Sequence, residues 1–289
     1  MKNSIRILLK IVAIFGFLSG LILLFYPWFS NSWNQYNNSL ILEEYQHKAE
    51  EKFVDESLVD EWEKAYAYNE ELQPVIIPDS FIQAEGVSEE DEKYYSCLNI
   101  NEDGMMGYIY IPKIKARVPI YHSTMESVLQ NGAGHIHGSS LPVGGESTHA
   151  AIAAHRGLPG AALFTDLDQL TEGDQFYLYV LDDILAYEID RILTVEPSNT
   201  EPLQVEEGED LVTLVTCTPY GVNSHRLLVR GHRVPYEEEK ETEQAKQVTQ
   251  SVHTNYVVWV VGGLAVTGIC IGLCAVIVKC VQRKKQKGQ

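Results

Sequence analysis

Acidic residues are missing from both ends of this 289-residue chain. Residues 1–28 and 256–289 contain none, although the whole chain has 40 acidic and 22 basic residues. Eight of the basic residues lie in these two ends, which leaves 14 between them against all 40 acidic ones, a net charge of −26. So negative a segment is a poor partner for nucleic acid or an anionic surface. It would suit cationic partners, lysine-bearing proteins included, although a solubilising surface is the simpler interpretation.

Long apolar runs occupy the two ends. Residues 5–28 are mostly apolar and residues 256–278 are uncharged, and about 20 such residues cross a bilayer. Basic residues flank the runs, namely Lys2, Arg6 and Lys10 at the first and five more in the tail 279–289. We therefore expect an N-terminal anchor at 1–28, a transmembrane helix at 256–278, both termini in the cytoplasm and the middle outside the cell membrane. A cleaved signal peptide is the alternative for the first run, but its length and its bulky end favour retention.

Cysteine is scarce, and only Cys97 and Cys217 lie between the two apolar runs. The sequence alone leaves a disulfide between them open. Cys217 ends a run of β-forming residues just before Thr218-Pro219, a context that favours a reactive thiol rather than half of a disulfide. Cys97 is predicted to be a small buried hydrophobe. The other three cysteines belong to the second apolar run and its edge.

The sequence pattern in the middle of the chain changes from helical to β-forming at residue 104. Residues 29–103 are predicted to be a helical region, with two helices over 39–72 broken near Asp55 and an irregular segment after them. From 104 to 235 short β-forming runs alternate with turn signals; these runs are 107–112, 116–121, 149–154, 175–181, 184–193, 211–216 and 226–230. At least seven such strands predict a mainly β domain, a closed barrel or a sandwich. Residues 236–255 are polar and are predicted to form a helix or tether.

Cys217 and Arg226 lie at the end of one predicted strand and the start of the next. A cation near a thiol lowers its pKa and can hold a developing oxyanion. His155, in Ala153-Ala154-His155-Arg156-Gly157, is the best third partner because it follows an apolar strand. The three residue types together predict covalent acyl transfer.

Other histidines compete with His155. His135 and His137 have the i, i+2 spacing that could bind a metal on a strand, but no Cys, Asp or Glu accompanies them at ligand spacing. His225 adjoins Arg226 and is predicted to line or support the site.

Residues 104–235 resemble the sortases, the cysteine transpeptidases of Gram-positive cell surfaces. The resemblance is carried by these motifs: Thr213-Leu214-Val215-Thr216-Cys217, His155-Arg156-Gly157, Arg226, Gly107-Tyr108-Ile109-Tyr110-Ile111-Pro112-Lys113-Ile114, Ser140-Leu141-Pro142-Val143-Gly144-Gly145 and Leu163-Phe164-Thr165-Asp166-Leu167. The segments 217–223 and 226–231, the N-terminal helices and the two apolar runs are similar to class C, the pilin-polymerising subgroup. The resemblance implies a closed sortase-type β-barrel flanked by two transmembrane helices.

The resemblance also implies a function. Cys217 would attack an LPXTG-like sorting signal and form a thioester, His155 would act as general acid and base, and Arg226 would hold the oxyanion. The acyl group would then pass to a lysine amine of a pilin subunit, with no cofactor and no metal. The alternatives are a sortase that anchors proteins to a peptidoglycan amine, a hydrolytic cysteine protease, and a catalytically silent surface-binding barrel.

Class C enzymes often have an N-terminal lid with an Asp-Pro-aromatic motif. This chain has Asp79-Ser80-Phe81 in a predicted lid near 77–83. The resemblance implies that Asp79 pairs with Arg226 and that Phe81 covers the thiol. Ser80 replaces a proline that would stiffen the loop, so a more mobile or differently shaped lid is expected.

Overall fold

The structure is a computed structural model, and it describes residues 29–53, 57–72, 92–158 and 160–242. The described residues up to Glu238 belong to one compact unit. The two predicted membrane runs and the predicted lid lie outside the described residues. Among the helices that are described, none is both long enough and apolar enough to cross a membrane.

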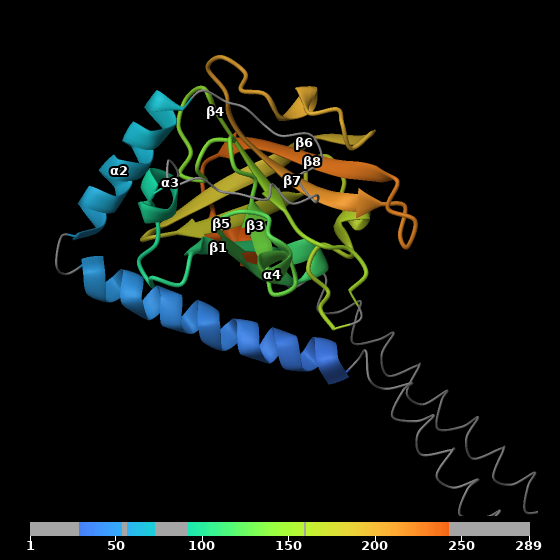
Figure 1. The fold of residues 1–289 in the computed structure, drawn as a ribbon, viewed down its shortest axis with the longest axis horizontal. Coiled ribbons are helices and arrows are strands. Elements are labelled where there is room, and N and C mark those ends of the chain that lie inside the picture. Colours follow the sequence, from blue (N-terminus) through green and yellow to red (C-terminus); the bar gives the residue numbers. More distant parts are fainter. Residues whose placement is uncertain (1–28, 54–56, 73–91, 159, 243–289) are drawn as a thin grey trace, which may run out of the picture. The chain divides into compact units, whose positions relative to one another are not determined.

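Eight strands close into a barrel in the order β1-β2-β3-β4-β7-β8-β6-β5 (Figure 1). Their bounds are β1 Met105–Ile111, β2 Ala116–Tyr121, β3 Ala133–His135, β4 Thr148–Ala153, β5 Gln175–Val180, β6 Asp183–Val195, β7 Asp210–Thr218 and β8 His225–Val234. Most neighbours run antiparallel, but β2 with β3 and β4 with β7 are parallel. The predicted mainly β class is confirmed, as a closed barrel rather than a sandwich, and all seven predicted strands are present.

The strand that the sequence pattern missed is β3. It has only three residues, too few for an alternation of polar and apolar side chains to be recognised. It is nevertheless paired on both sides, with β2 and with β4. A Cβ at Gly134 would lie 2.2 Å from the carbonyl oxygen of Ser123, so only glycine allows this close approach.

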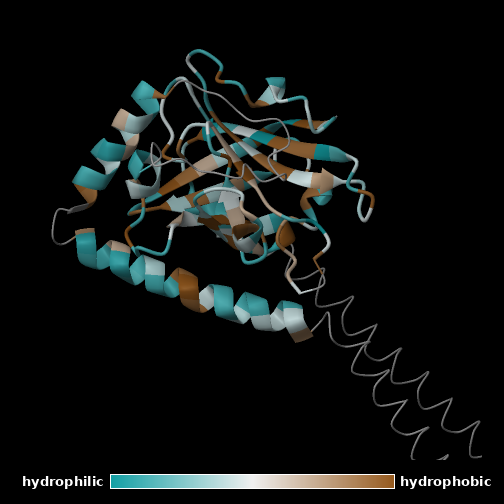
Figure 2. Cartoon of the chain, viewed as in Figure 1, coloured by the Kyte–Doolittle hydropathy of each residue, from teal (hydrophilic) through white to brown (hydrophobic). Residues whose placement is uncertain are grey.

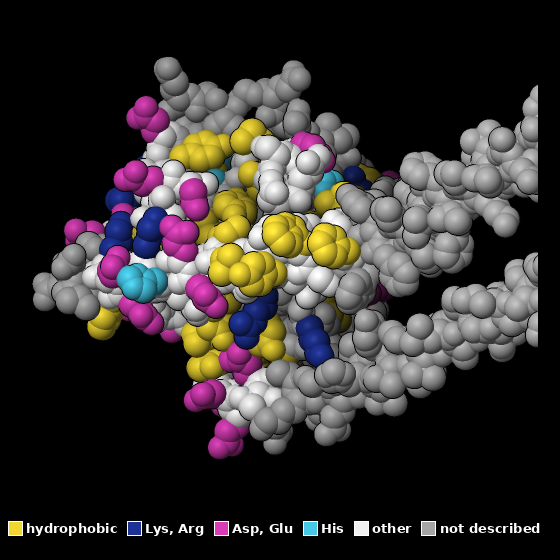
Figure 3. All heavy atoms as spheres, turned by 90° about the horizontal axis from the view of Figure 1, so that it is seen from below, with side chains coloured by type: hydrophobic (Ala, Val, Ile, Leu, Met, Phe, Trp, Pro, Cys, Tyr) yellow, Lys and Arg dark blue, Asp and Glu magenta, His cyan; other side chains and the backbone are white. Residues whose placement is uncertain are grey.

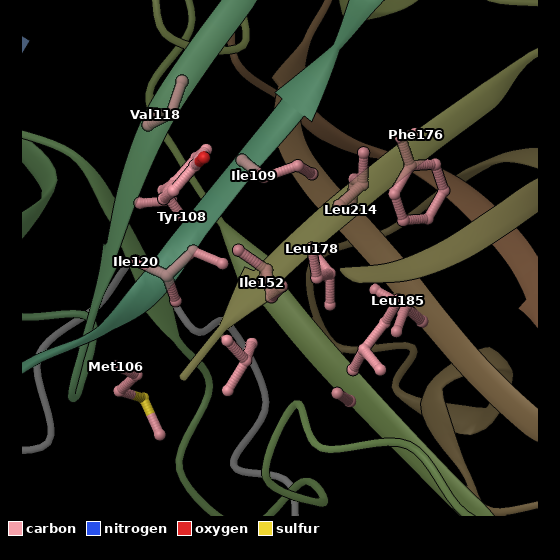
Figure 4. Close-up of a cluster of buried hydrophobic side chains, with 14 of the residues drawn as sticks. Met106, Tyr108, Ile109, Val118, Ile120, Ile152, Phe176, Leu178, Leu185 and Leu214 are labelled. Carbon is pink, nitrogen blue, oxygen red and sulfur yellow. The ribbon is translucent and has the colours of Figure 1, made fainter. Parts of the chain in front are cut away.

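An apolar core fills the barrel. Every residue of β1 is buried, and Figure 4 shows side chains from several strands meeting inside, among them Ile109, Ile152 and Leu214. These three side chains have no measurable exposure. Burying one side chain of this size contributes about 1.5–3 kcal/mol, so the core fixes the strands that carry the functional residues.

Helices precede and connect the strands. A helix covers residues 29–53, and the other helical segments are α2 Ser57–Glu71, α3 Glu92–Ser96, α4 Glu126–Leu129 and the short 3-10 turns η2 Pro112–Ile114, η3 Leu167–Gln169 and η4 Glu201–Leu203. Residues 238–242 are also helical. The two helices predicted within 39–72 are confirmed, but the first is already helical at residue 29.

Contacts with the barrel explain this early start. Residues 29–38 are rich in Asn and Ser, which favour helices weakly. Their side chains hold the loop after β4, because Asn31 Oδ1 accepts a hydrogen bond of 2.9 Å from the amide of Ala162 and Asn34 Nδ2 donates to the carbonyl of Gly160.

The same helix is also fixed further along. The Tyr45 hydroxyl donates to the carbonyl of Met106 at 3.0 Å and accepts from the amide of Leu181 at 2.9 Å. Figure 2 shows the mixed hydropathy of this helix beside the more hydrophobic strands. Tertiary contacts therefore determine where the helix lies against the barrel.

Candidate active site

Three neighbouring strands end or begin at one edge of the barrel. β4 and β7 run parallel, so their carboxyl ends lie at the same edge. β8 runs antiparallel to β7, so its first residues lie there too. Side chains that follow β4, end β7 or begin β8 are therefore brought together, although they are far apart in the sequence.

Cys217 and Arg226 are direct partners across the β7–β8 ladder. Both are buried, each with 8% of its surface exposed. The Arg226 guanidinium is held by backbone carbonyls, since Nη1 donates to Asn223 at 3.2 Å and to His225 at 3.1 Å. A fixed guanidinium is permanently charged and presents several donors in one plane. The ladder thus places a cation beside a thiol.

His155 lies at the end of the neighbouring strand. Ala153 is the register partner of Val215, and the pairing continues because Ala154 donates its amide hydrogen to the Val215 carbonyl at 3.1 Å. The Thr216 hydroxyl then donates to the Ala154 carbonyl at 2.8 Å. One further residue along both strands, this parallel register sets His155 beside Cys217.

The residue after the histidine locks this arrangement. Arg156 Nε donates to the Thr165 carbonyl at 3.1 Å and Nη1 donates to the Thr218 hydroxyl at 3.2 Å. Its guanidinium also pairs with Asp168. Arg156 thereby ties the histidine loop directly to the residue that follows Cys217. The sequence singled out the His-Arg-Gly motif but predicted no role for its arginine.

Gly157 completes the motif for a steric reason. Its φ of +79° lies in the left-handed region, and a Cβ there would come within 2.8 Å of the Tyr220 ring. Tyr220 belongs to the loop after Cys217 and is 60% exposed. The loops that follow β4 and β7 therefore pack directly against each other.

Sequence reasoning missed Glu126 altogether. Its Oε2 lies 3.4 Å from His155 Nε2, and it belongs to the short helix α4. The other carboxylate oxygen accepts a hydrogen bond of 3.0 Å from Gln130 Nε2. No local pattern points to this residue, because 29 positions of sequence separate it from the histidine.

Among the remaining predicted residues, His225 begins β8 at the same edge, and its carbonyl accepts a hydrogen bond from Arg226 Nη1. His225 is exposed, and its Nδ1 is hydrogen-bonded to Ser224 Oγ at 2.9 Å. Asp79 and Phe81 lie outside the described residues, so their predicted role as a lid stays a prediction. Cys97 and Cys217 are both thiols rather than a disulfide pair, and Cys97 has no exposed surface.

His135, one of the two rival histidines, occupies a different environment. His135 Nδ1 is hydrogen-bonded to the Tyr94 hydroxyl at 2.9 Å, and Nε2 to the Ser140 carbonyl at 2.8 Å. Complete burial lowers the pKa of His135 to about 3. Both ring nitrogens are thus engaged by protein atoms. No group of three or more His, Cys, Asp or Glu side chains in the described ranges is placed to hold a metal ion.

The chemistry available at the barrel edge follows from these side chains. A thiol and a guanidinium lie on adjacent strands, an imidazole follows the end of a third, and a carboxylate lies 3.4 Å from that imidazole. Such a set can supply a nucleophile, a proton carrier and an oxyanion donor. The geometry suits covalent acyl transfer.

Comparison with known proteins gives matches over the same region. Residues 109–234 match the family model described as the Sortase domain. Sortase C of Streptococcus pneumoniae is 46% identical with a TM-score of 0.60, over 68% of this chain and 97% of that one. Sortase C-1 of Actinomyces oris is 44% identical with a TM-score of 0.60, over 63% and 99% of the two chains. Sortase A of Bacillus anthracis is 28% identical over 154 residues, which are 53% of this chain and 71% of that protein.

Proposed function

Because this chain belongs to the sortase family of cysteine transpeptidases, we propose that it joins pilin subunits through Cys217. The substrate is an LPXTG-like sorting signal, and the acceptor is a lysine amine of the next subunit. The observation that carries the proposal is the register of β4, β7 and β8, which sets His155 and Arg226 on either side of Cys217.

The donor half of the reaction uses all three side chains. The Cys217 thiolate attacks the scissile carbonyl, and the oxyanion that develops is held by the Arg226 guanidinium. The imidazolium of His155 gives its proton to the departing amine as the carbon–nitrogen bond breaks. The products are a thioester on Cys217, a neutral His155 and a free amine on the released peptide.

The acceptor half restores the enzyme. A lysine amine attacks the thioester, a carbon–nitrogen bond forms and the carbon–sulfur bond breaks. The amine passes one proton to the neutral His155, which regenerates the imidazolium beside the thiolate. The product is an isopeptide bond between two proteins.

The choice of a pilin substrate is supported by a similar solved structure. The crystal structure of Streptococcus pneumoniae sortase C is described in terms of catalysis and pilin substrate specificity, and this chain spans 97% of it at 46% identity. The second candidate is a sortase that uses a peptidoglycan amine as acceptor.

Two further parts of the proposal concern residues outside the described ranges. We place 1–28 and 256–278 in the cell membrane, with the barrel outside and both termini inside, because basic residues flank each apolar run. Alkaline extraction of membranes should leave the chain in the pellet, and protease added to intact protoplasts should digest the barrel. A chain that alkali releases is not anchored.

The predicted lid is the second part of the proposal that concerns residues outside the described ranges. Asp79 and Phe81 restrain the resting enzyme in this proposal, Asp79 by pairing with Arg226 and Phe81 by covering the thiol. Asp79→Ala or Phe81→Ala should then speed the labelling of Cys217 by iodoacetamide. Equal labelling rates in the variants and the parent would remove the lid from the account.

Deletion of the gene tests the pilin assignment in the cell. High-mass pilin ladders should vanish from the cell surface and return with the parent gene but not with Cys217→Ala. Ladders that persist, together with loss of proteins from the wall, would favour the peptidoglycan acceptor. Purified enzyme that releases acyl groups to water even with abundant amine is a protease instead.

A further inference from the structure

A polar cavity of about 470 Å³ lies between the helix 29–53 and the barrel. Eleven described residues line it, and they come from that helix, from α4 and the two residues after it, from the loop after His155, and from the segment just before β1 and the end of β2; they include Asn34, Asn37, Asn38, Asp103, Gln130 and Asn131. Five of these eleven side chains are primary amides. A cavity of this volume is large enough to hold a ligand.

Two of the amides are available to a ligand. Asn37 and Asn38 are half-buried, and neither side chain makes a hydrogen bond within the described part of the chain. The neighbouring Asn34 differs, because its amide holds the Gly160 carbonyl. A side-chain amide has both donors and acceptors, the same groups that a peptide backbone presents. The pair therefore matches an extended peptide better than it matches an anion.

The charges around the cavity favour a cationic ligand. Asp103 is the one charged side chain among the described lining residues, and no lysine or arginine accompanies it. Residues 29–42 of the helix carry no charge, and acidic residues begin only at Glu43. Figure 3 shows this face from below, with most acidic side chains toward the left. Among the described residues that line the cavity, the single charge is therefore negative.

The cavity is connected to the active site through α4. Gln130 lines the cavity and donates to one oxygen of Glu126 at 3.0 Å. The other oxygen of Glu126 lies 3.4 Å from His155 Nε2, and 52% of the Glu126 side chain is exposed. A carboxylate therefore stands between the catalytic imidazole and the amide-lined cavity, open to an incoming group.

We propose that this cavity binds the acceptor, a lysine-bearing peptide segment of the protein that receives the acyl group. The amides of Asn37 and Asn38 pair with its backbone, and the lysine stem extends past Gln130 so that the ammonium reaches Glu126. This inference rests on the proposed transpeptidase function and adds to it the place of the second substrate. Cys217 and Arg226 bind the first substrate on the other side of His155.

The position of Glu126 fits the proton transfers that the acceptor lysine must undergo. A lysine ammonium loses two protons when it becomes an amide nitrogen. The first leaves to solvent as the ammonium becomes an amine, and the Glu126 carboxylate holds the cation at that point. The second passes to the neutral His155 when the amine attacks the thioester and the carbon–sulfur bond breaks. No oxidant or further reactant is required.

Acceptor kinetics of the full chain test this site. The double variant Asn37→Ala/Asn38→Ala should raise KM for a peptide with a single lysine about tenfold, because each lost hydrogen bond weakens binding several-fold. The matched control is Ser32→Ala/Gln35→Ala, on exposed positions of the same helix that do not line the cavity. Glu126→Gln keeps the size of the side chain and should raise the same KM several-fold.

A small neutral amine serves as the internal comparison for the two asparagines, because it does not need their amides. We expect Asn37→Ala/Asn38→Ala and its control to match the parent with this nucleophile. Peptide KM values equal to those of the control in both Asn37→Ala/Asn38→Ala and Glu126→Gln would overturn the inference. The inference would also be overturned if these variants lost affinity only for glycan-bearing muropeptide acceptors and not for the lysine peptide. A parent enzyme that forms no thioester at all would instead contradict the proposed function.

Discussion

Cys217 and His155 lie at the barrel edge where β4 and β7 end, whereas Cys97 and His122 lie in the apolar core. In the core pair, His122 Nε2 is hydrogen-bonded to the Cys97 carbonyl at 2.9 Å, and the two residues are 3% and 0% exposed. At the edge, 21% of the His155 side chain is exposed and a carboxylate lies beside it. The same two residue types thus occupy opposite environments in one molecule.

The core environment explains why Cys97 and His122 are unsuited to acyl transfer. Burial raises the pKa of the Cys97 thiol and lowers the pKa of the His122 imidazole. Both shifts favour the neutral forms, which neither attack a carbonyl nor deliver a proton. At the edge a guanidinium lies beside the thiol, and a carboxylate lies beside the imidazole. Charged neighbouring side chains therefore distinguish the edge pair from the core pair.

Removal of the edge thiol should have the largest effect. Cys217→Ala is expected to lower transpeptidation by at least about four orders of magnitude, because the covalent step is lost. Thermal unfolding should change little, since the side chain lies at the edge of the barrel. Cys97→Ala is the matched control and should retain activity. Equal losses in both variants would erase the distinction between the two sites.

Arg226→Lys should have the next largest effect. The charge remains, but the planar set of donors is lost, and removal of an oxyanion donor lowers the rate about 10²–10³-fold. The decrease should fall on the rate of thioester formation, which single-turnover mass spectrometry measures. Arg117→Lys, at an exposed position of β2, is the control. A parent-like rate in Arg226→Lys would remove the guanidinium from the mechanism.

Acid should destabilise the fold through the core histidines. In the unfolded chain His135 takes up a proton near pH 6.5, whereas in the fold its pKa is about 3. Between these values the unfolded state binds more protons, so stability is lost as the pH falls. The slope contributed by His135 is at most about 1.4 kcal/mol per pH unit.

The histidine variant isolates this contribution. His122 and His149 also have lowered pKa values because they are buried, so they add the same slope to every protein compared. His135→Gln should show a shallower fall in the free energy of unfolding between about pH 6 and pH 4. Parallel curves for parent and variant would contradict the neutral, buried His135.

The smallest effect is expected for the core thiol. Cys97→Ala should lower the free energy of unfolding by about 1 kcal/mol, the typical cost of one core substitution. Iodoacetamide should label Cys97 only after denaturation, because its Sγ is buried against the Lys93 carbonyl at 3.2 Å. Labelling of Cys97 in the native protein, at a rate close to that of Cys217, would contradict the comparison.

Local sequence patterns predicted the three main residues of the edge site but not the residues that hold them in place. Cys217 and Arg226 were found because a strand, a loop and a second strand are continuous in sequence. His155 followed from its place after an apolar strand. The contribution of Arg156 was missed because its contacts with Thr218 and Asp168 depend on which loops meet in space.

Long-range pairing also hid other features. β3 is too short to show a period, and the register of β2 with β3 comes from the closed barrel. Glu126 reaches His155 only because α4 lies at the same barrel edge. Residues 29–38 are weak helix formers by composition, and their helix is stabilised by the loop after β4. Such contacts between distant segments cannot be read from a local window.

Trapping of the acyl-enzyme tests the central claim most directly. The purified chain is mixed with a sorting-signal peptide, quenched in acid and digested, and the mass of the peptide that contains Cys217 is measured. We expect the acyl fragment as a thioester on Cys217, and its transfer to a lysine peptide when acceptor is added before the quench. A parent enzyme without any adduct, or a Cys217→Ala variant that still forms one, would contradict the account.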